Sequence, residues 1–298
     1  MAVHSFTGAR LDKPVSHVPD RPILTVVVDT EEEFNWNAPF SRANTGTKSA
    51  TSQELAHEIF DPLGIVPAYV VDQAIVDSDV ASDYFSGLKA AGRCEIGMHL
   101  HAWLTPPFDE DVCDYNSFQG NLRPALEFTK MSNLKNAISQ CFGEAPTIFK
   151  AGRYGVGPQT FDILKQLGFK IVCSVTPHTS YAEIGGPNFH GLPATPFWID
   201  EDSSLLGLPL TRGFTGAAAA CGPKLKGLFD FDIYKRLKVP AILSRSGLVE
   251  RVTLTPEGVP AADQKKLLQR LFNQGERFFS LAYHSSSMGV GHTPYVQS

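Results

Sequence analysis

The chain has 298 residues, of which 43% are hydrophobic and 19% charged, the composition of an ordinary globular protein rather than a disordered one. A formal net charge of -5 without any basic block excludes the phosphate contacts of a nucleic-acid-binding protein, so we expect no nucleic-acid partner. No apolar run approaches the ~20 residues of a membrane span, and five cysteines without a CxxC pair favour reduced thiols over a disulfide framework.

The N-terminal stretch lacks the apolar segment of a signal peptide. We therefore interpret residues 1–21 as a flexible arm and expect a cytoplasmic protein. No internal repeat and no convincing linker interrupts the remainder, so we predict one domain over residues 22–298.

The first half of the chain alternates between predicted strands and helices. A continuous β-branched run begins it, which is typical of a strand buried on both faces. Because strands alternate with helices, we predict parallel strands joined by right-handed crossovers. The predicted elements are a strand at Ile23–Val28, a helix from Ser52 to about Leu63, a strand at Ile65–Val71, a helix at Asp79–Ala91 and a strand at Cys94–His101.

The second half continues the alternation less regularly, with Gly/Pro-rich loops between its elements. We predict helices at Leu126–Phe142, Pro158–Leu167, Ile233–Pro240 and Asp263–Asn273, and extended segments at Thr147–Lys150, Phe169–Val175, Leu205–Leu210, Leu248–Leu254 and Phe278–Tyr283.

Ionisable side chains gather at the predicted strand ends. Asp29 and Glu31 are two residues apart and point the same way if the chain is extended, and the pair His99 and His101 repeats that spacing. Two imidazoles and a carboxylate suit a zinc site with one open position. Alternatively, the acidic residues complement a helix N-terminus, the His-x-His pair is structural, and the run Glu31–Glu33 is solvated with a single member inside.

Four segments, in this order, resemble the polysaccharide deacetylase superfamily (NodB homology, carbohydrate esterase family 4), in particular its WalW-like branch. The resemblance extends from about Ile23 to Val296. It implies a distorted (β/α) barrel of the α/β class, typically with seven parallel strands, and metal-assisted hydrolysis of an N-acetyl group on a sugar. The segments are VVVDTEEEFNW (Val26–Trp36), CEIGMHLHAWLTPP (Cys94–Pro107), FKAGRYGVG (Phe149–Gly157) and FSLAYHSSSMGVGHTPYV (Phe279–Val296).

The resemblance also implies catalytic roles. Asp29 matches the general base of the family, and His284 matches its late histidine, the general acid. Lys150 occupies the place of an arginine that orients the base in many members, and we expect the nearby Arg153 to take over that task. A backbone N–H in the Tyr154–Gly155 turn is the expected oxyanion donor.

For the metal, the resemblance implies the ligands Glu31, His99 and His101, with zinc as the expected ion and cobalt, nickel or manganese as further options. Two positions depart from the family pattern. Thr30 stands where many members have the metal-binding acid, and Trp103 stands where the second histidine usually lies.

We expect a carbohydrate or amino-sugar substrate bound by Trp36, Trp103, Tyr154 and His292. The two tryptophans either stack on a sugar ring or close the end of the barrel. Two other functions stay open at this point: a catalytically degenerate relative that binds a glycan or a partner, and a metal-independent amidohydrolase acting on a non-sugar ring such as allantoin.

Overall fold

The computed structural model describes residues 13–15, 19–200 and 202–296. The chain divides into two compact units, a large one (Thr25–Cys173 and Ala282–Ser298) and a small one (Met1–Leu24 and Ser174–Leu281). The single domain expected over residues 22–298 stays a prediction. Most of the predicted N-terminal arm, residues 1–12 and 16–18, lies outside the described residues, whereas Lys13–Pro14 forms strand β1.

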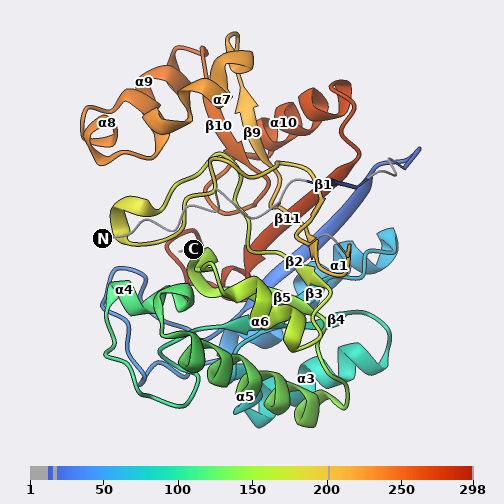
Figure 1. Ribbon diagram of the computed structural model, residues 1–298. Helices are drawn as coiled ribbons and strands as arrows, with labels where there is room; N and C mark the ends of the chain where they lie inside the picture. Colours follow the sequence, from blue (N-terminus) through green and yellow to red (C-terminus); the bar gives the residue numbers. More distant parts are fainter. Residues whose placement is uncertain (1–12, 16–18, 201, 297–298) are drawn as a thin grey trace. The chain divides into compact units, whose positions relative to one another are not determined.

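The large unit is built on a parallel sheet, as the alternation of strands and helices predicts (Figure 1). Its described parallel pairings join β2 to β3, β3 to β4, β4 to β5 and β5 to β6, which is five of the seven strands expected. Val26, Val27 and Val28 are buried, so the first strand has the two covered faces that its apolar run indicates. The strands are β2 (Ile23–Thr30), β3 (Ala68–Val71), β4 (Glu95–Leu100), β5 (Ile148–Ala151), β6 (Ile171–Val172) and β11 (Phe278–His284).

Helices fill the crossovers of this sheet. α3 packs beside α5, and α5 packs on β4 (Figure 1). α5 buries Met131, Leu134 and Ile138 and ends at Gly143, whose φ of 74° is the left-handed conformation that favours glycine. Among the described residues, no helix combines the length and the apolar character needed to span a bilayer. The helices are α1 (Glu54–Phe60), α2 (Gln73–Val76), α3 (Asp79–Ala90), α4 (Asp114–Ser117), α5 (Pro124–Phe142) and α6 (Thr160–Gln166).

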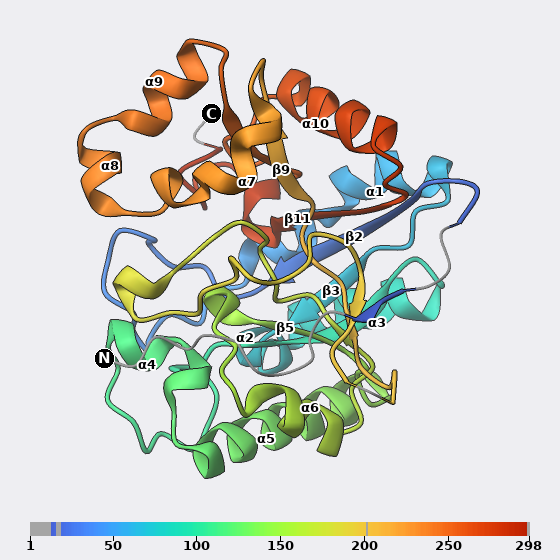
Figure 2. The ribbon, with the colours of Figure 1, turned by 45° about the horizontal axis from the view of Figure 1, so that its top comes forward.

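The small unit contains an antiparallel pair of strands, β9 and β10, and α10 packs on both of them (Figure 2). The helix predicted over Ile233–Pro240 is two helices, because Lys238 between them has a φ of 56°. The described strands of the unit are β1 (Lys13–Pro14), β7 (Phe197–Trp198), β8 (Leu206–Gly207), β9 (Arg212–Thr215) and β10 (Glu250–Thr253), and its helices are α7 (Gly222–Leu225), α8 (Asp232–Arg236), α9 (Val239–Arg245) and α10 (Ala261–Asn273).

Candidate active site

The carboxyl ends of β2, β4 and β5 bring most of the predicted site residues to one edge of the parallel sheet. Asp29 lies in β2 and Glu31 directly follows it, while His99 lies at the end of β4 with His101 two residues further on. Register places His99 opposite Lys150 of β5. Because neighbouring parallel strands end at the same edge, side chains 50 to 120 residues apart in the sequence line one cavity.

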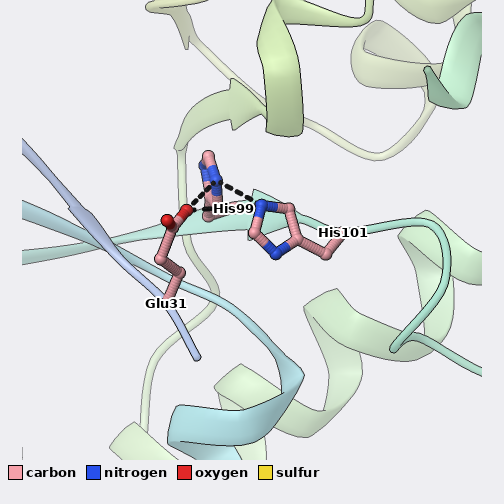
Figure 3. A group of neighbouring side chains, drawn as sticks. All are labelled: Glu31, His99 and His101. Carbon is pink, nitrogen blue, oxygen red and sulfur yellow. Dashed lines mark hydrogen bonds and ion pairs between the residues drawn. The ribbon is translucent and has the colours of Figure 1, made fainter. Parts of the chain in front are cut away.

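Glu31, His99 and His101 form a compact triangle of ligand atoms (Figure 3). Glu31 Oε2 lies 3.1 Å from His99 Nε2 and 3.3 Å from His101 Nε2, and the two imidazole nitrogens are 3.2 Å apart. The three residues are only 2–3% exposed. Ligands held at zinc bond lengths in a tetrahedron are roughly 3.3 Å apart or slightly more, so these residues fit one face of a tetrahedral divalent-metal site.

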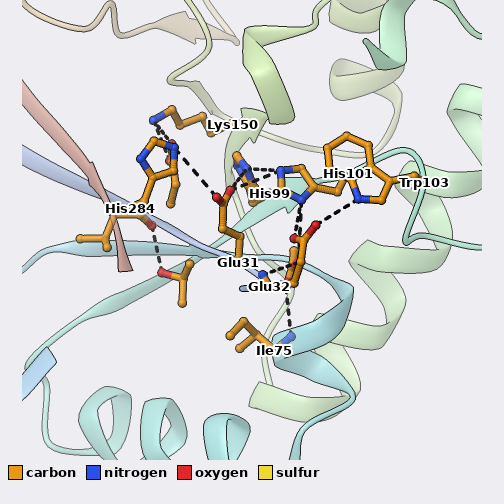
Figure 4. A network of polar contacts seen from close by, with 12 residues as sticks. Glu31, Glu32, Ile75, His99, His101, Trp103, Lys150 and His284 are labelled. Carbon is orange, nitrogen blue, oxygen red and sulfur yellow. Dashed lines mark hydrogen bonds and ion pairs between the residues drawn. The ribbon is translucent and has the colours of Figure 1, made fainter. Parts of the chain in front are cut away.

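A second carboxylate holds His101 in the orientation of this triangle (Figure 4). Glu32 Oε2 lies 2.6 Å from His101 Nδ1, and Glu32 Oε1 accepts a 3.0 Å hydrogen bond from Trp103 Nε1. When Nδ1 carries the proton and donates it to Glu32, Nε2 has a lone pair that faces Glu31 and His99. Glu32 therefore selects the tautomer of His101 that a metal requires.

Burial and neighbouring charges shift the pKa values of the residues around the triangle of ligand atoms. Asp72 accepts a 3.1 Å hydrogen bond from the Glu32 backbone N–H and is fully buried. Burial, together with the negative charge of Glu32, raises the pKa of Asp72 well above its usual value. Burial alone would lower the pKa of His101, but the adjacent Glu32 and Glu31 carboxylates raise it well above the usual value. The Glu32 and Glu31 carboxylates thus favour a positive charge at the position of His101.

Lys150 is the cation beside Asp29. Its Nζ lies 2.6 Å from each oxygen of the Asp29 carboxylate, and both side chains are buried. Burial alone would lower the pKa of Lys150, but Asp29 raises it above the ordinary value, so the ammonium stays charged. The guanidinium of Arg153, which we expected beside Asp29, hydrogen-bonds Ser117 and lies 4.2 Å from the Phe118 ring centroid. The lysine at the family's arginine position therefore holds Asp29, while the role expected for Arg153, which lines the same cavity, stays a prediction.

His284, at the end of β11, reaches the same cavity from the other side. Its Nε2 is 3.7 Å from Asp29 Oδ2 and 4.0 Å from Glu31 Oε1, and its side chain is 26% exposed. Trp36 packs edge-on against the imidazole, with ring centroids 4.6 Å apart. A partly exposed imidazole next to the buried carboxylates is in a position to transfer a proton to a molecule in the cavity.

Aromatic side chains form the walls of the cavity, which has a volume of about 250 Å³. Trp36, Trp103 and Tyr154 contribute to the lining, as predicted, together with Phe34 and Phe40. Trp103 is 2% exposed and packs between two rings, with centroid distances of 4.2 Å to His101 and 4.4 Å to Phe40.

One prediction at the rim of the cavity is corrected. His292 is not among the described residues that line the cavity; its Nδ1 lies 3.3 Å from Glu33 Oε2. The backbone N–H of Gly155 donates to the Gly152 carbonyl at 2.9 Å, so the oxyanion donor predicted in the Tyr154–Gly155 turn stays a prediction for the Tyr154 N–H alone. Aromatic side chains bound much of the space for a ligand.

Sequence reasoning missed Glu32 and the contact made by Lys150. The alternative of a solvated run with one inward member is wrong, because Glu31 and Glu32 are 3% and 1% exposed. Thr30, at the family's usual acid position, hydrogen-bonds the Val28 carbonyl at 3.0 Å and leaves the ligand position to Glu31. One feature of the sequence indicated a buried acceptor such as Glu32: a tryptophan at position 103, four residues after His99, whose indole N–H needs a hydrogen-bond acceptor when it is buried.

Comparison with solved structures supports the fold. A protein of Mycobacterium smegmatis assigned as a polysaccharide deacetylase is 13% identical, with 95% of this chain and 84% of that chain covered at a TM-score of 0.50. An allantoinase (14% identity, 92% and 82% covered, TM-score 0.48) and the chitin deacetylase of the fungus Colletotrichum lindemuthianum (14%, 91% and 90%, 0.37) are also similar. No protein-family model and no curated protein matches the chain. The fold is that of the polysaccharide deacetylases, the α/β barrel type that the sequence resemblance implies.

Proposed function

We propose that the chain is a metal-dependent hydrolase that removes an N-acyl group, in the first place acetyl, from an amino sugar or a polysaccharide precursor. One observation supports it above others. The triangle of Glu31, His99 and His101 lies in the same cavity as the Asp29–Lys150 pair and His284. The donor set of a divalent cation therefore stands beside one group suited to accept a proton and another suited to donate one.

At the two positions where the chain lacks the family's metal ligand, another residue of the site supplies the missing group. Glu31 takes the ligand position in place of Thr30, and His101 supplies the imidazole that Trp103 cannot. These replacements argue against a degenerate site. The convergence of three buried ligand atoms likewise argues against an amidohydrolase that works without metal.

The roles of the residues follow from their positions. A divalent cation bound by Glu31, His99 and His101 would polarise the acyl carbonyl and acidify water. Asp29 accepts a proton from the attacking water as the water oxygen bonds to the acyl carbon, and Lys150 orients the Asp29 carboxylate through their 2.6 Å contact. His284 donates a proton to the nitrogen as the C–N bond breaks, which releases a carboxylic acid and an amine.

The cavity supports a small ring as the substrate. Its volume of about 250 Å³ is just below the range of pockets that enclose a drug-sized ligand. Trp36 and Tyr154 both line the cavity and are partly exposed, so both can offer a ring face to a sugar. A single sugar residue with its acyl arm in the cavity, the rest of a chain remaining outside, fits these dimensions.

The experiment measures acetate release from N-acetylglucosamine and its oligomers, after metal removal and again with zinc, cobalt, nickel or manganese restored. We expect release only with a restored metal, and loss of at least ~100-fold in kcat for Asp29→Asn. Glu33→Gln is the matched control, because Glu33 neighbours the ligands but contacts His292 and the Ser49 backbone instead.

Three results would contradict the proposal. Glycan binding without acetate release under every metal would favour the degenerate relative. Hydrolysis of allantoin that persists after chelation would favour the metal-independent amidohydrolase. Full activity of the Asp29→Asn variant would remove Asp29 as the base.

A further inference from the structure

The small unit holds a group of basic side chains that the proposed reaction does not use. We call it the cationic cluster. It surrounds the loop at Thr179 and lies wholly between residues 178 and 253. Its members are His178, His190, Arg212, Lys226 and Arg251, together with one carboxylate, Asp230.

Asp230 neutralises only part of this charge. Its Oδ1 lies 2.6 Å from Arg251 Nη1, and its Oδ2 lies 2.5 Å from His190 Nε2 and accepts a 3.0 Å hydrogen bond from the Ser180 N–H. Although burial opposes ionisation, His190 and Arg251 lower the pKa of Asp230 below its ordinary value. Asp230 is therefore an anion whose oxygens are already occupied by partners.

Arg212 has no carboxylate partner among the residues that the structure describes. Its Nε donates to Thr253 Oγ1 at 2.7 Å and its Nη1 donates to Thr179 Oγ1. The register of β9 and β10 places Arg212 opposite Thr253, and Arg251 opposite Phe214. Because alternate residues of a strand share a face, the two arginines lie on one face of this strand pair, diagonal to each other.

Lys226 adds a second cation without an acidic partner in the described part of the chain. Its Nζ donates to the His190 carbonyl at 2.5 Å, which leaves two of its three hydrogens for other acceptors. Arg251 Nη1 meanwhile donates to the His178 carbonyl at 2.7 Å. These contacts thus hold Arg251 at the His178 carbonyl, Arg212 at the neighbouring Thr179 and Lys226 at the His190 carbonyl.

The pKa of His178 reflects the excess of positive charge in the cluster. Burial and the positive charges of Lys226, Arg251 and Arg212 lower the pKa of His178 to about 4. His178 is neutral at pH 7, but three permanent cations still face a single carboxylate. All three cations are only partly buried, so a ligand from solution can reach them.

We propose that the cationic cluster binds the phosphoryl group of a phosphorylated ligand. A phosphate group carries about -1.5 to -2 charges and three acceptor oxygens, which matches the excess charge and the donors of Arg212 and Lys226. A carboxylate carries one charge and two oxygens, and would leave one cation unpaired. The site is separate from the residues of the proposed hydrolase reaction.

The test is calorimetric titration of the full chain with inorganic phosphate at constant ionic strength, with sodium acetate as the carboxylate arm. We expect one saturable phosphate site per chain and no comparable acetate binding. Arg212→Gln and Lys226→Gln each remove a charged hydrogen bond and should weaken phosphate binding by about tenfold or more.

Arg236→Gln is the matched control, because it removes a cation from the same unit whose side chain is 80% exposed. Its phosphate affinity should stay within about twofold of the original. As an independent readout, bound phosphate should raise the pKa of His178, measured from the NMR shifts of its ring.

Equal weakening by Arg212→Gln and Arg236→Gln, acetate affinity equal to that for phosphate, or no saturable binding would each overturn the assignment. Thermal unfolding of each variant checks that its fold is retained. None of these results depends on acetate release, so failure here leaves the proposed hydrolase function untouched, and the reverse also holds.

Discussion

Replacing Glu32 by Gln tests whether this buried carboxylate fixes the metal-binding form of His101. The substitution keeps the shape of the side chain but replaces one of its two acceptor oxygens by an NH2 donor. In the native chain both oxygens are used, one by His101 Nδ1 at 2.6 Å and the other by Trp103 Nε1 at 3.0 Å. A glutamine can satisfy only one of these two donors.

Each orientation of the glutamine has a definite consequence. If its NH2 group faces His101, Nδ1 must become the acceptor, the proton moves to Nε2, and the nitrogen is lost as a ligand. If its NH2 group faces Trp103, two buried donors oppose each other, at a penalty of about 1–3 kcal/mol. Loss of such an outer-shell partner typically lowers metal affinity by about 10–100-fold, and we expect that range here.

The assay is competition for zinc against a chelator of known affinity, supported by the visible spectrum of the cobalt-loaded protein. Glu33→Gln is the matched control, since Glu33 lies one residue away and contacts His292 rather than the ligands. Equal zinc affinity of Glu32→Gln and the native chain, with both folded, would refute the role assigned to Glu32.

Three further predictions concern the ion pair, the aromatic wall and the pH dependence of stability. Lys150→Met leaves the buried Asp29 side chain without its partner, so the free energy of unfolding measured in urea should fall by about 3–5 kcal/mol. Adding Asp29→Asn to the same chain should restore part of this loss, and additive losses would contradict the coupling. Trp36→Ala removes the ring that packs on His284 and should raise KM for an N-acetylated sugar by about three- to tenfold, with unchanged KM as the contrary result. Burial and neighbouring cations lower the pKa of His178 to about 4, below the ~6.5 of the unfolded chain. The unfolded state therefore binds more protons in that window, so stability should fall as pH falls from about 6.5 to about 4. His178→Asn, which tolerates the φ of 60° at this position, should flatten the slope, and an unchanged slope would count against the assignment.

The sequence was sufficient for the parts of the site that depend on local geometry. The alternation of strands with helices predicts that neighbouring strands are parallel. A spacing of two residues predicts that the side chains of Asp29 and Glu31 point the same way, as do those of His99 and His101. The structure brings all four into one cavity. Each of these inferences needs only the period of a strand and the rule that parallel strands end together.

The parts that failed depend on tertiary contacts. Glu32 directly follows Glu31 and received no role from the sequence, where solvation of the run was one alternative, but it accepts hydrogen bonds from the buried donors of His101 and Trp103, about 70 residues away. Choosing between Lys150 and Arg153 as the partner of Asp29 requires the paths of both side chains. Arg153 has a φ of 54°, which no pattern in the sequence indicates.

X-ray diffraction at the zinc absorption edge, on crystals grown with one equivalent of zinc, tests the central claim most directly. We predict a single strong anomalous peak within about 2.0–2.2 Å of Glu31 Oε2, His99 Nε2 and His101 Nε2. A peak at any other place in the protein, with none between these three atoms, would contradict the account.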